Sequence, residues 1–247
     1  MNPVAVSRAL FWRGQRPVVD RARACAQKVQ MWRARNVAPA PQPDGPLAED
    51  AARHVLEHLE HHRLPQPDRH TCASSAMVVL RMLRDPTRAE EVLGTPEPEV
   101  AFARAATGVL HRTNDWLDAR RRPQLPWPLR WDSRPAGVLR LLNSPEGYGA
   151  RGRRYRNRVV DPTDPGPMYE AIRAEVESGE PVLLFIGDRR WFKHTVLVVR
   201  ATAEQLTVYE PTRGRLVPTG RPGFIAGEID SLGWRTAWLA LLPDRAR

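Results

Sequence analysis

The spacing of apolar residues along the chain changes near residue 180, from a helix-like to a strand-like pattern. Before that point apolar residues recur at intervals of three and four, as in amphipathic helices. This spacing predicts helices over residues 5–35, 47–64, 72–84, 87–94, 97–110, 134–143 and 164–180. Short apolar or alternating runs then predict strands over residues 181–187, 194–201, 205–211, 214–219 and 236–243. An N-terminal helical half packed on a C-terminal, mostly antiparallel sheet is an α+β fold.

The N-terminal part of the chain divides into two segments that precede the main domain. In residues 1–35, arginines are set among apolar side chains, which predicts a basic amphipathic helix. This helix either packs on the main domain or docks a partner, and a membrane-surface or translocation role stays open. Residues 36–46, NVAPAPQPDGP, form a predicted linker, because proline fixes φ and removes backbone donors. The main domain is expected over residues 47–247.

Positive charge changes the picture of the surface more than that of the fold. The formal net charge is +10 at pH 7, and Lys28 and Lys193 are the only lysines. Residues 117–158 carry eleven arginines against three acidic residues, and their segment GYGARGRRYRNR (147–158) predicts an exposed loop. Such a surface attracts anions, so an acidic peptide or protein substrate is one expectation. Specific nucleic-acid binding is not expected, because no RNA- or DNA-binding motif accompanies the charge.

Cysteine and histidine usage limits the remaining classes. Cys25 and Cys72 are the only cysteines, which excludes a disulfide framework and a CxxC-type site and fits a reducing compartment. No apolar run approaches the ~20 residues of a membrane span, and no secretory cleavage site follows residues 5–35. We therefore expect a cytoplasmic protein, with non-standard export left open. His54 and His58 lack a motif partner, so neither a metal nor another cofactor is expected.

Cys72 opens the apolar run CASSAMVVLRM and is placed at the start of a predicted helix. Unpaired backbone N–H groups and the helix dipole favour the thiolate at such a position, and the thiolate is the nucleophilic form. The alternative is a small buried residue that packs in the core, since free cysteine is among the most buried residue types.

The two strands predicted over 194–201 and 205–211 form a hairpin that turns around Thr202–Glu204. A turn centred near Thr202 predicts that His194 lies directly opposite Glu210. Opposed side chains have Cβ atoms about 4.5–5.5 Å apart, so the carboxylate can hold the imidazole N–H. This is the third-member role in a nucleophile–base–orienter set. The alternative is a histidine bonded locally at a strand end.

Gln66, followed six residues later by CASSAMVVLRM, resembles the nucleophile segment of papain-like cysteine peptidases. The likeness is closest to the bacterial branch that removes double-glycine leaders from peptide bacteriocins. A later segment, GEPVLLFIGDRRWFKHTVLVVRATAEQLTVYEPTRGRL, resembles the strand, histidine and acidic-residue pattern of that branch. The specific matches lie within residues 66–82 and 179–214.

The resemblance implies a papain-like fold and a role for each matched residue. Cys72 would be the nucleophile, His194 the general base and acid, Glu210 the orienting carboxylate and Gln66 an oxyanion donor. Ala73 stands where the family usually has glycine, so its methyl group would border the approaching acyl group. Glu210 replaces the usual aspartate, and Thr195 replaces a frequent aromatic. We also expect Trp191 and Phe192, just before the base, to wall the substrate cleft.

These residues predict a cysteine-dependent hydrolase that cleaves a peptide or isopeptide amide through an acyl-enzyme on Cys72. An amine in place of water would make the same site an acyltransferase or cyclase, and attack on a glutamine side chain would make it a deamidase. A non-catalytic interaction module on the same fold is the remaining alternative.

Overall fold

The computed structural model describes residues 46–115, 132–144, 148, 153–188, 190–229 and 233–244. The basic helix predicted over residues 5–35 lies outside them, as does the linker apart from Pro46. Among the described residues, no helix has the length and apolarity that a membrane crossing requires.

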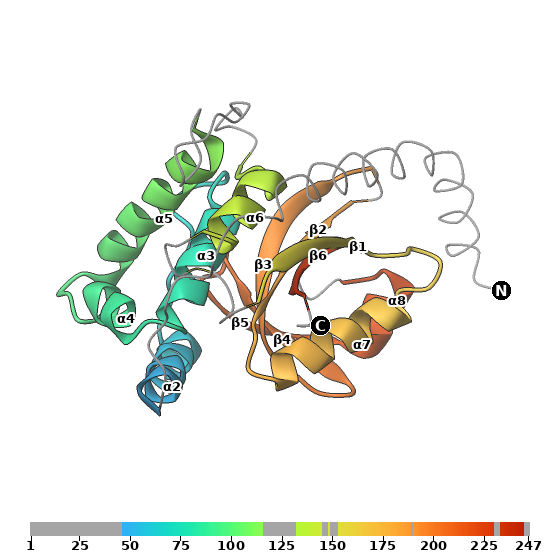
Figure 1. Ribbon diagram of the computed structural model, residues 1–247, viewed down its shortest axis with the longest axis horizontal. Coiled ribbons are helices and arrows are strands. Elements are labelled where there is room, and N and C mark those ends of the chain that lie inside the picture. Colours follow the sequence, from blue (N-terminus) through green and yellow to red (C-terminus); the bar gives the residue numbers. More distant parts are fainter. Residues whose placement is uncertain are drawn as a thin grey trace.

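Helices and a six-stranded sheet make up the described fold (Figure 1). The helices are α2 (Pro46–His61), α3 (Cys72–Met82), α4 (Pro86–Leu93), α5 (Pro98–Asn114), α6 (Pro135–Leu142), α7 (Gly166–Glu177) and α8 (Arg221–Ala226). The strands are β1 (Tyr155–Val159), β2 (Val182–Gly187), β3 (Phe192–Ala201), β4 (Gln205–Glu210), β5 (Arg215–Gly220) and β6 (Thr236–Pro243). Their order in the sheet is β1-β6-β2-β3-β4-β5, and every neighbouring pair is antiparallel. The predicted α+β class is therefore confirmed.

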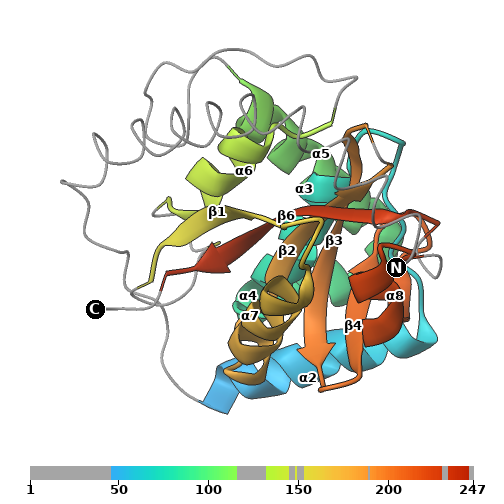
Figure 2. The same cartoon turned by 90° about the vertical axis from the view of Figure 1, so that its right-hand side faces the viewer.

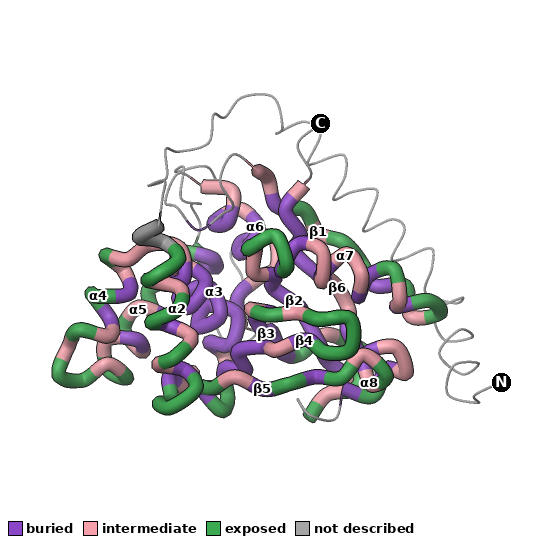
Figure 3. The backbone as a smooth tube through the Cα atoms, turned by 90° about the horizontal axis from the view of Figure 1, so that it is seen from below, coloured by how far each residue is buried: buried purple, intermediate pink, exposed green. Residues whose placement is uncertain are grey.

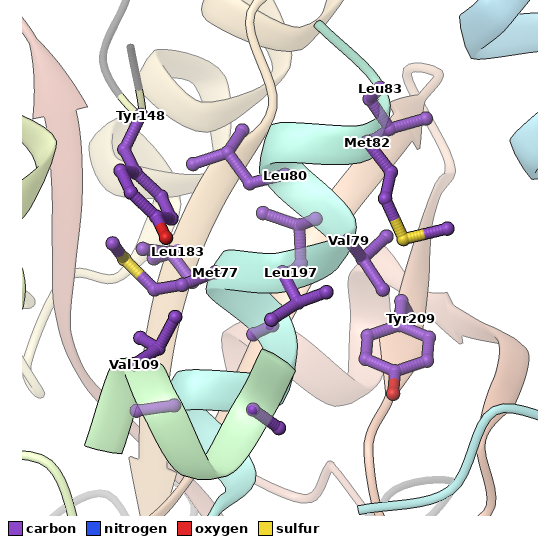
Figure 4. Close-up of a cluster of buried hydrophobic side chains, with 14 of the residues drawn as sticks. Met77, Val79, Leu80, Met82, Leu83, Val109, Tyr148, Leu183, Leu197 and Tyr209 are labelled. Carbon is purple, nitrogen blue, oxygen red and sulfur yellow. The ribbon is translucent and has the colours of Figure 1, made fainter. Parts of the chain in front are cut away.

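The sheet is covered on both faces, so it carries two separate apolar cores. Helices α2 to α6 lie on one side of the sheet, and α7 and α8 lie on the other (Figures 1 and 2). The core beneath α3 includes Met77, Leu80, Leu183, Leu197 and Tyr209 (Figure 4). The core beneath α7 includes Tyr169, Ile172, Leu184, Val196 and Val208. Figure 3 shows how buried segments concentrate in α3 and the central strands. Burying one such side chain contributes about 1.5–3 kcal/mol.

The prediction of an exposed loop over residues 147–158 is wrong for residues 155–158, which belong to β1. Tyr155 is buried, and its hydroxyl accepts a hydrogen bond from Arg84 at 2.7 Å. Arg156 and Arg158 point to solvent from alternate positions of the strand. An edge strand with arginines on its outer face has no apolar periodicity, which explains why its sequence resembles a loop.

The β3–β4 hairpin turns where the sequence predicts, but its register differs from the predicted one. The N–H of Thr202 donates to the carbonyl of Gln205 at 2.8 Å, which closes the turn. Leu197 pairs with Tyr209, and a bulge beyond Val198 shifts the ladder toward the turn. Continued from Leu197, this register sets Val196 opposite Glu210. The prediction that His194 directly faces Glu210 is therefore wrong by two residues.

Candidate functional site

Cys72 is the first residue of α3, and its side chain is 1% exposed. Thr71 occupies the N-cap position but makes no side-chain bond to the helix. The first turn of α3 therefore lacks a cap from its own segment, and its N–H groups are available to other partners.

Two residues from distant segments contact the Cys72 sulfur. The thiol donates a hydrogen bond to the Asp132 carboxylate, and the backbone N–H and hydroxyl of Thr195 donate to the sulfur. Burial, then the Asp132 charge, raise the pKa of Cys72 well above its ordinary value, while the Thr195 donors act in the opposite direction. In this arrangement Cys72 rests as a protonated thiol, in contrast to the thiolate predicted from its place at a helix start.

Asp132 supplies the cap that Thr71 does not. Its carboxylate accepts hydrogen bonds from the backbone N–H groups of Ala73 and Ser133. Burial raises the pKa of Asp132 from 3.8 to about 6, although these hydrogen bonds and the His194 charge work against the rise. Asp132 has a left-handed φ of 65°, a conformation that aspartate tolerates better than most residues. Asp132 is not among the site residues that the sequence predicts.

A hydrogen-bonded frame from α5 and α6 holds Asp132 in place. The Asn114 side chain donates to the carbonyl of Asp132 at 2.9 Å and accepts the N–H of Arg134 at 3.1 Å. The hydroxyls of Thr113 and Ser133 lie 2.9 Å apart. Asp132 is therefore fixed on both sides by buried polar contacts.

His194 and Glu210 form a buried pair on the sheet. The Nε2 atom of His194 lies 2.6 Å from an oxygen of Glu210, and the two residues are 6% and 3% exposed. The N–H groups of Thr212 and Arg213 also donate to the carboxylate, at 3.0 and 2.7 Å. Burial alone would raise the pKa of Glu210, but the His194 contact and these donors hold it below its ordinary value. The offset of two residues is diagonal on one sheet face, a separation that the long glutamate side chain spans.

Strand alternation directs the neighbours Thr195 and His194 to opposite faces of the sheet. Thr195 shares its face with Leu197, which belongs to the core beneath α3. His194 shares its face with Val196, in the core beneath α7, and its ring stacks on Trp234 at a centroid distance of 6.0 Å. Of these two neighbours on β3, Thr195 therefore contacts the Cys72 sulfur directly, and His194 does not.

A cavity of about 460 Å³ opens at the start of β3. Its lining includes Asp132, Phe185, Trp191, Phe192, His194 and Thr195. A β-bulge lies here, because Ile186 pairs with His194 and Gly187 with Phe192. The bulge turns Phe192 toward the core beneath α3 instead of to the His194 face. Trp191 is 55% exposed and stacks on Phe192 at 4.6 Å, so both residues predicted to wall a cleft do line a cavity.

Gln66 and Ala73 lie close to the site in different ways. The Gln66 side-chain nitrogen donates to the carbonyl of Asp68 at 2.6 Å, and its buried oxygen has no hydrogen-bond partner among the residues that the structure describes. The Gln66 backbone N–H donates to the carbonyl of Pro211 at 2.8 Å, beside Glu210. Ala73 is fully buried, and its N–H belongs to the Asp132 cap. The oxyanion role of Gln66 and the substrate contact of Ala73 stay predictions.

The described part of the chain contains no group of three or more His, Cys, Asp or Glu side chains placed to hold a metal ion. At the end of α2, the ring of His58 stacks on that of His62, the residue after the helix, at a centroid distance of 4.7 Å. Burial, followed by the charges of His62 and His54, lowers the pKa of His58.

Comparison with known proteins yields no match among protein-family models, curated proteins or solved structures. The class of fold is therefore given by the structure alone: N-terminal helices on a six-stranded antiparallel sheet. The likeness of the sequence to papain-like peptidases stays a prediction.

Proposed function

We propose that the protein is a cysteine-dependent hydrolase with a papain-like arrangement, which cleaves a peptide or isopeptide amide bond through an acyl-enzyme on Cys72. The observation that carries the proposal is the buried His194–Glu210 pair, whose side chains lie 2.6 Å apart. Thr195, the residue after His194 on β3, contacts the Cys72 sulfur. The cysteine, the histidine and the carboxylate chosen from sequence spacing thus lie on three neighbouring elements, since α3 packs on β3 and β3 pairs with β4.

The geometry supports a division of roles. Nε2 of His194 is held by Glu210, so Nδ1 is the ring nitrogen left to exchange a proton with a reacting group. The Glu210 carboxylate fixes the ring and stabilises its protonated form. The His194 ring borders the same cavity as Trp191 and Phe192, whose aromatic faces suit an apolar substrate side chain. Water or an amine at this acyl-enzyme would give hydrolysis or transfer. Attack of Cys72 on a glutamine side-chain amide, with loss of ammonia and then hydrolysis of the thioester, would give deamidation.

The test is active-site labelling of the full chain with a peptidyl acyloxymethyl ketone at pH 7. We expect labelling of Cys72, located by peptide mass mapping, to be faster than that of free N-acetylcysteine. Cys25→Ser is the matched control and should keep the label, whereas Cys72→Ala should lose it. Labelling of Cys72 no faster than that of the free thiol contradicts the proposal.

A non-catalytic interaction module is the second candidate, and the burial of Cys72 as a protonated thiol favours it. In that case Cys72 is a packing residue beneath the Asp132 cap. A Cys72→Ala variant that keeps every biological effect of the protein would support the module and contradict the hydrolase.

A further inference from the structure

One member of each of two acid–base pairs lines the cavity. His194 is paired with Glu210, and the Asp132 carboxylate is paired with the Cys72 thiol. The two carboxyl groups are tuned in opposite directions, because the pKa of Asp132 is raised to about 6 and that of Glu210 is lowered. Carboxyl groups with separated pKa values commonly divide the acid and base roles of a site.

The structure places Asp132, and not His194, in hydrogen-bond contact with the sulfur's proton. Strand alternation turns the His194 ring away from the sulfur and toward Trp234, and His194 shares the cavity lining with Asp132. The part-buried hydrogen bonds from Asn114 to Asp132 and from Arg134 to Asn114 hold Asp132 at the sulfur, so this contact is built into the fold.

We infer that Asp132 is a catalytic residue, which holds the Cys72 proton at rest and accepts it when the sulfur attacks an acyl carbon. The inference rests on the proposed function and deepens it by naming the first proton acceptor. His194, with Glu210, then serves the later step in which water attacks the acyl-enzyme.

The proton balance closes with these residues alone. The sulfur–carbon bond forms while the thiol proton moves to Oδ2 of Asp132. The carbon–nitrogen bond then breaks, and Asp132 returns that proton to the leaving nitrogen, which departs as an amine. Water next gives a proton to His194 as it attacks the thioester carbon, and that proton passes to the departing sulfur. Asp132 ends as a carboxylate and Cys72 as a thiol, as they began.

The other ionisable groups around the cavity are Arg69, His70, Lys193 and His194. Lys193 is paired with Asp188 at 2.6 Å, outside the contact between sulfur and carboxylate. Thr195 is the opposing influence on the thiol, since its two donors favour the thiolate. Substitutions of Asp132 and of Thr195 should therefore change the reactivity of the Cys72 thiol in opposite directions.

The experiment measures two rates in the full chain carrying Cys25→Ser, so that one thiol reports. The first is alkylation of Cys72 by iodoacetamide between pH 6 and 10. The second is acylation of Cys72 by a panel of peptide p-nitroanilides that includes one ending in Gly-Gly, followed by p-nitroaniline release and intact mass. Asp132→Asn keeps the shape of the side chain and removes its charge. Asp85→Asn is the matched control, because Asp85 caps α4 through the N–H groups of Thr87 and Arg88.

We expect Asp132→Asn to change the two rates in opposite directions. Alkylation at pH 7 should rise at least about tenfold, because an adjacent like charge no longer opposes the thiolate. Acylation by the amides should fall about 100-fold, the smaller end of what a positioned base contributes. Thr195→Val should slow alkylation, and Asp85→Asn should change neither rate. Unfolding would also expose the buried thiol and abolish acylation, so the circular dichroism spectrum and the urea midpoint of Asp132→Asn must show that the variant is folded under the assay conditions.

Three results would overturn the inference. If both rates rise in Asp132→Asn, the carboxylate only restrains the thiol. If the alkylation rate does not change, Asp132 does not hold the thiol proton. The third result needs no variant at this position. If the alkylation rate of the protein that retains Asp132 reaches its plateau below pH 9.0, the ordinary pKa of a thiol, the inference is also overturned. If no amide acylates the protein that retains Asp132, the proposed function fails, and the alkylation rates still decide where the proton lies.

Discussion

Asp132→Asn should change how the stability of the protein depends on pH. Folding raises the pKa of this carboxyl from 3.8 to about 6, so the folded state binds the proton more tightly than the unfolded chain. The resulting stability is fully present below about pH 3.8 and is lost as the pH rises through about 6. At about 1.4 kcal/mol for each pH unit between the two values, the loss is about 3 kcal/mol.

Urea unfolding at pH 3.5, 5, 6 and 7.5, followed by circular dichroism, measures this effect. We expect the free energy of unfolding of Asp132→Asn, minus that of the unsubstituted protein, to increase by about 3 kcal/mol from the lowest to the highest pH. The Asp85→Asn control shows what the loss of a capping carboxylate does without burial beside Cys72. A difference that stays constant with pH would refute the reasoning, because Asp132 would then titrate alike in both states.

Three further substitutions test other parts of the account. Glu210→Ala leaves the buried His194 ring and two backbone donors without a partner, so urea unfolding should show a loss of about 2–4 kcal/mol; a loss below 1 kcal/mol would contradict the buried pair. Trp191→Ala should raise KM for peptide amides while thermal unfolding changes little, because the ring is 55% exposed at the cavity; an unchanged KM would remove it from the binding site. Gly214→Ala should cost more than Gly179→Ala in urea unfolding, because both glycines have a positive φ but a Cβ at Gly214 would lie 2.4 Å from the Pro65 nitrogen; equal losses would show that contact to be harmless.

The apolar period predicts the order and type of most elements, because helices and strands that bury one face must repeat their apolar residues. It fails at β1, where Arg156 and Arg158 alternate on a solvent-facing edge and only Tyr155 reaches the core. It also fails for the hairpin register, because Ala201 pairs with Leu206 and the turn is therefore centred between residues 203 and 204, not at Thr202.

The candidate site could be predicted in part. Cys72, His194 and Glu210 are found from residue type and spacing, and Glu210 reaches His194 despite the shifted register because its side chain is long. Asp132 could not be found in this way, since it lies 60 residues from Cys72 and one acidic residue in an arginine-rich stretch carries no local signal. Only the packing of α5 and α6 beside α3 brings it to the sulfur.

The central claim is that Cys72 forms a covalent acyl intermediate, and rapid-quench mass spectrometry of the full chain with peptide p-nitroanilides tests it most directly. The account predicts a transient mass increase equal to the peptide acyl group, mapped to Cys72, together with release of one equivalent of p-nitroaniline. It also predicts that the adduct persists in His194→Ala and is absent in Cys72→Ala. Amide cleavage that continues in Cys72→Ala, or cleavage with no adduct on this residue, would contradict the account.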